Sequence, residues 1–170
     1  MRSSYSHTIA ELESSAKASA SVREDLKKIV ASEGQLVIEN DFFGPQPRIK
    51  VVVHNGSSRG VSSLQWRASL YLDNAKTPVA TTVLSQDFKS DGGFKPSQSY
   101  ASTFTVGFVR GDETWTTLEV RNATQRRVLL ESVLNTVRDF GDRPYLANDE
   151  VEEIRALREA KAEADKYSDI

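Results

Sequence analysis

The spacing of hydrophobic positions divides the chain into three zones. From about Thr8 to Glu33 apolar residues recur every three or four positions, which predicts a helix with one buried stripe. Gly34 is a natural end for it, and capping-box patterns at Thr8 and Ser21 leave open whether the zone holds one helix or two. We therefore expect a helical segment over residues 1–34.

From Gln35 to about Arg138 the hydrophobic period becomes two, and β-branched and aromatic residues become frequent, which is typical of strands. In the clearest case, alternate residues from Leu64 to Leu72 are apolar and those between them are mostly polar. The other predicted strands are Leu36–Asp41, Arg48–His54, Val79–Asp87, Tyr100–Arg110, Thr114–Asn122 and Val128–Val133. Asn-, Asp- and Gly-containing turn signals separate them, and irregular chain is expected after Val133.

About seven short strands with no helix between them predict a mainly β fold. The predicted architecture is an immunoglobulin-like antiparallel β-sandwich over residues 35–138, and a closed barrel is the alternative. Because the chain has no cysteine, packing alone must hold the layers together. We expect Trp66, Phe104 and Phe108 to carry that core.

The third zone changes composition again. Residues 139–148, which include Gly141 and Pro144, are predicted to be a linker. Residues 149–170 are rich in Ala, Glu, Lys, Arg and Leu, which predicts a charged C-terminal helix. Its apolar stripe is thin, so we expect it to form a contact surface rather than core, with a solvated tail as the alternative.

The charge balance limits the classes of partner. The 170 residues include 22 Lys and Arg and 24 Asp and Glu, a net charge of −2. No overall field attracts a polyanion, so nucleic acid is not expected as a partner. Apolar runs such as Val51-Val52-Val53 are far shorter than the roughly 20 residues that span a bilayer, so no transmembrane segment is predicted.

The chemically versatile residues form no motif typical of an enzyme. His7 and His54 are far apart in sequence and have no spaced metal-ligand partner, so both are interpreted as structural. Asp87 and Asp91 precede Gly92-Gly93 without the alternating ligands of a calcium loop, which favours an ordinary turn. No Gly-x-Ser-x-Gly or phosphate-binding glycine motif occurs. The sequence therefore predicts no catalytic residue, no cofactor, no metal site and no enzyme.

Two short patterns are compatible with a surface role. Asn55-Gly56-Ser57 and Asn122-Ala123-Thr124 match the glycosylation acceptor sequence, although asparagine at a strand end more often caps its own turn. Arg121 and the pair Arg126-Arg127 could form a small anion patch, but solvated strand and turn charges are the simpler interpretation.

The order of these signals resembles a group of uncharacterised bacterial envelope lipoproteins. The resemblance rests on the hydrophobic strand that ends in Asn55-Gly56-Ser57, the long strand to Leu72, and Gln86-Asp87-Phe88 followed by Gly92-Gly93-Phe94-Lys95-Pro96. It spans about residues 48–120, and Ser97 stands where glycine is usual. It implies a periplasmic or envelope location with a lipid anchor upstream of this chain; a cytoplasmic location is the alternative.

These signals support two functional hypotheses. The first is a non-enzymatic binding or structural module, associated with the cell envelope, whose partner is a protein. The alternative is a small-molecule-binding or hydrolytic domain with a site at the ends of the sandwich. The sequence leaves the oligomeric state open.

Overall fold

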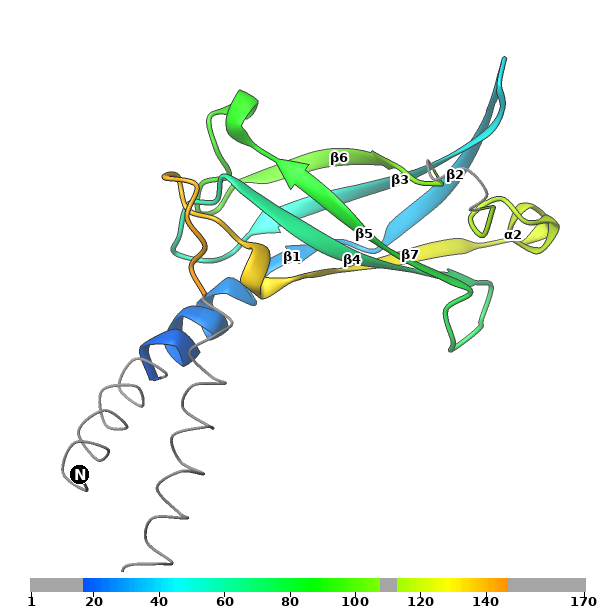
Figure 1. Ribbon diagram of the computed structural model, residues 1–170. Helices are drawn as coiled ribbons and strands as arrows, with labels where there is room; N and C mark the ends of the chain where they lie inside the picture. Colours follow the sequence, from blue (N-terminus) through cyan, green and yellow to red (C-terminus); the bar gives the residue numbers. More distant parts are fainter. Residues whose placement is uncertain (1–16, 108–112, 147–170) are drawn as a thin grey trace, which may run out of the picture.

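The computed structural model describes residues 17–107 and 113–146. Residues 17–26 are helical, and antiparallel strands dominate the other described residues (Figure 1). The strands are β1 (Ile29–Ala31), β2 (Gly34–Asp41), β3 (Gly44–Asn55), β4 (Ser63–Leu72), β5 (Ala80–Asp87), β6 (Ser99–Thr105) and β7 (Arg126–Ser132). The connections contain the short helices η1 (Lys89–Asp91), α2 (Leu118–Asn122) and η2 (Leu134–Thr136). The predicted mainly β class with about seven antiparallel strands is confirmed.

All seven strands belong to one sheet, in the order β1-β3-β2-β7-β4-β5 with β6 on β3. The ladder between β2 and β7 contains only the pairs Gly34↔Val128 and Gln35↔Arg127. The sheet folds over at this short ladder, so β6, β3 and β2 form one layer and β7, β4 and β5 the other (Figure 1). The result is sandwich-like, but its two layers are continuous through hydrogen bonds, whereas the predicted immunoglobulin-like sandwich consists of two separate sheets.

The core lies between the two layers. On β4, the predicted inward face of alternate residues from Leu64 to Leu72 is buried along its whole length. Trp66 is fully buried as predicted, Phe104 is only partly buried, and Phe108 lies outside the described residues. Trp115, Val120 and Val106 are also buried and extend the core toward α2. Period-two patterning therefore predicted which face of the sheet is dry.

The N-terminal zone differs from its prediction. The described helix ends at residue 26, and Ile29–Ala31 form β1, which pairs with the end of β3 from Val53 to Asn55. Ile29 fits a helical stripe and a buried strand equally well, and a tertiary pairing selected the strand. Gly34 does not end a helix but begins β2, where a Cβ atom would lie 3.1 Å from the carbonyl oxygen of Val128. The glycine allows the two layers to join closely.

The predicted strand Thr114–Asn122 is wrong. Residues 118–122 form the helix α2, and the Thr117 hydroxyl caps it by accepting a hydrogen bond from the Val120 backbone N–H at 3.2 Å. Val120 is buried, so one turn of helix places a single apolar side chain on the core. The cap and the burial of this one side chain favour the helix over the strand that the period-two pattern predicted.

Within the predicted linker, Tyr145 and Leu146 pack against the sandwich, whereas residues 140–144 are exposed. Val137 and Leu146 are buried, and the Tyr145 hydroxyl donates a hydrogen bond of 2.6 Å to the carbonyl oxygen of Gly60. Gly141 lies in a turn, and Pro144 forms an isolated β-bridge with Arg138. The remaining linker residues and the predicted helix at 149–170 lie outside the described residues.

We call the end of the molecule where residues 17–26, 55–60, 88–98 and 137–146 meet the base (Figure 1). There, the Asp25 carboxylate accepts hydrogen bonds from the backbone and hydroxyl of Ser58 and pairs with Arg59 at 3.1 Å. The Arg59 guanidinium in turn lies over the ring of Tyr145. The Ser58 hydroxyl holds the pKa of Asp25 below its usual range, and burial raises the pKa of Tyr145. The loop 55–60 thus binds both the N-terminal helix and the segment 137–146.

Candidate binding surfaces

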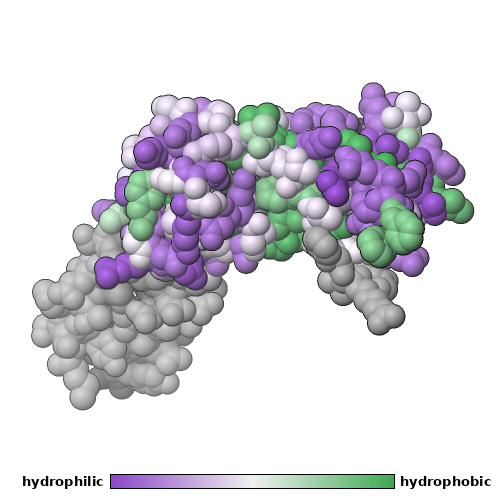
Figure 2. Space-filling model, turned by 90° about the horizontal axis from the view of Figure 1, so that it is seen from above, coloured by the Kyte–Doolittle hydropathy of each residue, from purple (hydrophilic) through white to green (hydrophobic). Residues whose placement is uncertain are grey.

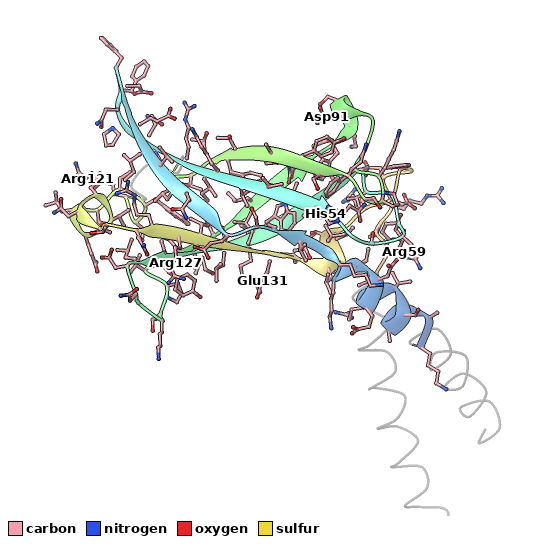
Figure 3. The ribbon with its side chains drawn as sticks, turned by 180° about the vertical axis from the view of Figure 1, so that it is seen from behind. His54, Arg59, Asp91, Arg121, Arg127 and Glu131 are labelled. Carbon is pink, nitrogen blue, oxygen red and sulfur yellow. The ribbon has the colours of Figure 1, made fainter. Side chains whose placement is uncertain are left out.

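The charged residues that the sequence offered as candidates do not converge on one site. His54 and Arg59 lie at the base, whereas Arg121 and Arg127 lie at the opposite end (Figure 3). His54 is exposed on β3 and shares a 2.7 Å hydrogen bond with the Ser99 hydroxyl, a cross-strand contact. Asp91 ends η1, whose turn closes on Gly92 in the left-handed region, and so occupies the predicted ordinary turn. His7 lies outside the described residues.

Asn55, which matches the glycosylation acceptor sequence, has a structural role. The side chain is fully buried: its amide donates to the carbonyl oxygens of Arg59 at 2.8 Å and Phe94 at 2.9 Å. Its Oδ1 accepts from both the backbone N–H and the hydroxyl of Ser57, which is the predicted asparagine turn. A buried amide with every bond occupied cannot serve as a sugar acceptor or contact a ligand.

The predicted anion patch is used by the fold itself. Arg126 donates to the carbonyl oxygens of Leu36, Val120, Arg121 and Ala123, so it ties α2 to β2. Arg127 donates to the carbonyl oxygens of Asp73 and Ala75 and lies over the ring of Tyr71. Both guanidinium groups already have acceptors within the chain, which supports the structural interpretation. Asn122 is exposed at the end of α2.

The most exposed large apolar side chains stand together at the turn between β2 and β3. Phe42 is 97% exposed and Phe43 is 87% exposed, and their rings meet edge to face with centroids 5.6 Å apart. The Asp41 carboxylate accepts the Phe43 backbone N–H at 2.8 Å and fixes the turn. We call Phe42 and Phe43 the aromatic tip. Residues so apolar and so exposed are typical of interaction sites.

The aromatic tip projects because the hairpin is longer than its neighbours. On β3 the ladder with β6 ends at Arg48, and on β2 the ladder with β7 covers only Gly34 and Gln35. The pairs Glu39↔Gln46, Asn40↔Pro45 and Asp41↔Gly44 therefore form a ribbon without a further strand beside it in the described residues. At about 3.4 Å per residue, the ribbon carries the tip roughly 10 Å beyond the sheet, away from the base (Figure 1).

The ribbon below the tip is acidic. Residues 39–46 contain Glu39 and Asp41 and no basic residue. The nearest bases, Arg48 and Lys50, lie further down β3 and approach Glu39 at 3.6 and 3.7 Å. Glu39 is therefore balanced by two bases, and Asp41 is the acid that stands beside the apolar pair. In the sequence, the two adjacent phenylalanines before Gly44-Pro45 are the signal for the aromatic tip, whereas Gly44-Pro45 indicates only a turn.

A second surface is a groove of about 690 Å³ where the start of β4 and the end of β5 meet η2 and the segment 138–146. Its walls mix apolar surface with polar side chains, which include Gln65, Ser85, Asp87, Asn135, Thr136 and Arg138. Thr136 accepts the Gln65 backbone N–H at 2.9 Å, while Arg138 contacts Asp142 at 3.8 Å. The groove offers hydrogen-bond donors and acceptors from several segments, so its lining is suited to a polar ligand.

Metal and membrane signals are missing from the described residues. Within residues 17–107 and 113–146, no three acidic or histidine side chains are grouped so that they could hold a metal ion. In the same residues no helix has the length and apolar character needed to cross a bilayer.

No protein-family model, no curated protein and no solved structure matches this chain. The resemblance to envelope lipoproteins therefore stays a prediction.

Proposed function

We propose that this chain is a non-enzymatic binding module of the cell envelope that contacts a protein partner through the aromatic tip. The observation that carries the proposal is the near-complete exposure of Phe42 and Phe43, at 97% and 87%. Burying one phenylalanine in a partner contributes roughly 1.5–3 kcal/mol, so a pair at the end of a ribbon is a compact anchor.

The base and the aromatic tip lie at opposite ends of the molecule, which supports a role of the tip in binding. Residues 17 and 146, where the described chain starts and stops, both belong to the base, and the aromatic tip lies at the opposite end (Figure 1). A module held through its base directs Phe42 and Phe43 away from the attachment. This geometry suits a domain tethered at an envelope surface, as the lipoprotein resemblance implies.

Charge decides the kind of partner. Asp41 directly precedes the tip and has no basic residue near it in residues 39–46, and an anionic lipid surface repels a carboxylate at that place. A protein pocket with an apolar floor and a basic rim complements both the rings and the carboxylate. The partner is therefore a protein with a cationic rim.

The test compares three baits in an envelope fraction: the natural chain, the double variant Phe42→Ser/Phe43→Ser, and the control Leu118→Ser. Leu118 is 67% exposed on α2, so the control removes a similarly exposed apolar side chain elsewhere. We expect a discrete protein to bind the natural chain and the control but not the tip variant, with weaker capture at high salt. Equal capture by all three baits contradicts the proposal. Binding to phospholipid vesicles that requires Phe42 and Phe43 replaces the protein partner with a membrane.

The location is tested separately by the coding sequence upstream of Met1 and by cell fractionation. An apolar segment that ends in a cysteine supports the envelope lipoprotein, and recovery of the natural protein in the cytosol contradicts it.

The groove at the end of β4 and β5 supports a second candidate, a module that binds a small polar ligand. Its volume of about 690 Å³ falls in the range of ligand sites, and its polar side chains come from several segments. A library of sugars, amino acids and nucleosides, followed by thermal shift, tests it. A ligand whose stabilisation disappears in Ser85→Trp, which fills the groove from the exposed edge, supports this function.

A further inference from the structure

Strand β6 has a free edge without the usual protection. It pairs with β3 on one side, and no other strand in the described part of the chain pairs with its second side. Its residues Ser99–Thr105 include no charged residue and no proline. Sheet edges are normally guarded by lysine, proline or a bulge, because their backbone groups otherwise pair with another chain. The free edge of β6 can therefore accept the backbone hydrogen bonds of an added strand.

The hydrogen-bond pattern shows which backbone groups are available. The bonds from Asn55 N to Gln98 O at 2.9 Å and from Val106 N to Pro47 O at 3.2 Å enclose the β3–β6 ladder. Bonded and non-bonded pairs alternate along an antiparallel ladder, so Tyr100, Ser102 and Phe104 direct their backbone groups to β3. Ala101 and Thr103, like the strand's end residues, direct theirs to the free side.

The sequence of β6 complements itself when reversed. Reading outward from Ser102, Ala101 corresponds to Thr103, Tyr100 to Phe104, and Ser99 to Thr105. We propose that β6 pairs antiparallel with β6 of a second copy of this chain, about a two-fold axis at Ser102. Ala101 and Thr103 of one copy then exchange backbone bonds with Thr103 and Ala101 of the other, while the two Ser102 residues form the central non-bonded pair.

The side chains suit this pairing on both faces. Outward, Ser99, Ala101 and Thr103 are small and exposed, so no bulky or charged group opposes its copy. Inward, Tyr100 of one copy opposes Phe104 of the other, an aromatic cross-strand pair. Of the other strands at the ends of the strand order, β1 has only three residues, and β5 ends in Asp87 and has no such reversed symmetry, which makes β6 the preferred edge.

The first test measures the oligomeric state of the full chain by analytical ultracentrifugation over a range of concentrations. We expect a dimer that Thr103→Pro converts to monomer, because proline removes an N–H that points to the second copy and leaves the β3 ladder intact. Thr81→Pro is the matched control. The bond from the Phe88 N–H to the Ser62 carbonyl oxygen fixes which residues of β5 bond to β4, so the N–H of Thr81 points to the free side of β5, and proline removes it. This control should leave the dimer unchanged. Ala101→Lys, which adds a charge to the same edge, should also give monomer while circular dichroism shows an intact sheet.

The second test uses the absence of cysteine from the chain. Ser102→Cys places one thiol on the two-fold axis, where residues of a non-bonded pair have Cα atoms about 4.5 Å apart, within disulfide reach. Mild oxidation should give a disulfide-linked dimer of Ser102→Cys and little of Thr82→Cys, the inward-facing equivalent on β5. A natural chain that stays monomeric at all concentrations overturns the proposal. A dimer that Thr81→Pro disrupts and Thr103→Pro preserves overturns it as well.

Discussion

The base and the aromatic tip are opposites in how they use polar and apolar groups. At the base, Asn55 is buried with all its bonds made, and Asp25, Arg59 and Tyr145 link three segments. At the tip, Phe42 and Phe43 contact mainly each other. Figure 2 shows hydrophobic side chains standing out on the mostly polar end that carries the hairpin. The polar groups of the base stabilise the fold, whereas the apolar groups of the tip are free for another molecule.

The largest effect is expected from Asn55→Ala. The change leaves the buried N–H of Ser57 without an acceptor and removes the bonds that the amide donates to the carbonyl oxygens of Arg59 and Phe94. These two oxygens keep their bonds from the Ser57 hydroxyl and the Val61 N–H. At about 1–3 kcal/mol for an unsatisfied buried group and about 1 kcal/mol for each further bond lost, we expect a loss of roughly 3 kcal/mol in the free energy of unfolding, measured with urea. Asn122→Ala, in the exposed second copy of the same tripeptide pattern, should change it by less than about 0.5 kcal/mol. Similar values for both variants would remove the distinction between base and surface.

A smaller loss is expected from Gly60→Ala. A Cβ atom at this position would lie 2.5 Å from the ring of Phe140, which must then swing away. Because that ring is 57% exposed, we expect a loss of about 1 kcal/mol rather than unfolding. The double variant Gly60→Ala/Phe140→Ala should be no less stable than Phe140→Ala alone, because the clash is gone. Additive losses would show that the alanine strains the backbone instead.

Asp25→Asn should reduce stability by about 1 kcal/mol at neutral pH, because it replaces a charged acceptor of the Ser58 and Arg59 bonds. The pKa of Asp25 is lowered in the folded chain, so its contribution is present above the unfolded value near 3.8 and is lost as pH falls through the folded value. The difference in melting temperature between Asp25→Asn and the natural chain should therefore be steady from pH 7 to about 5 and disappear in acid. A constant difference down to pH 2 would assign the effect to packing.

The smallest effect on stability is expected at the tip. Phe42→Ser/Phe43→Ser removes two rings that are almost wholly in water, so the free energy of unfolding should change by less than about 0.5 kcal/mol. The same variant should abolish binding of the protein partner. A clear loss of stability would show that the tip packs against part of the chain outside the described residues.

The sequence alone determined the elements whose pattern has one physical meaning. Apolar and polar residues alternate from Leu64 to Leu72. This alternation separates the two kinds of residue onto opposite faces of a strand but not of a helix, so β4 and its buried face were predictable. The turn role of Asn55 was also predictable, because asparagine bonds its own backbone two residues on. The expectation of no metal-ligand or nucleophile motif also rests on residue types and spacing, and it stays a prediction.

Only the tertiary structure decided the rest. Ile29–Ala31 and Leu118–Asn122 are short segments whose residues suit helix and strand nearly equally. Pairing with β3 makes the first segment a strand, and burial of one valine favours the helix in the second. The aromatic tip was present in the sequence as Phe42-Phe43, but its exposure depends on where the neighbouring strands stop. The free edge of β6 depends on which strands lie beside which, and strand order is set by contacts between residues far apart in the chain, which local patterns do not encode.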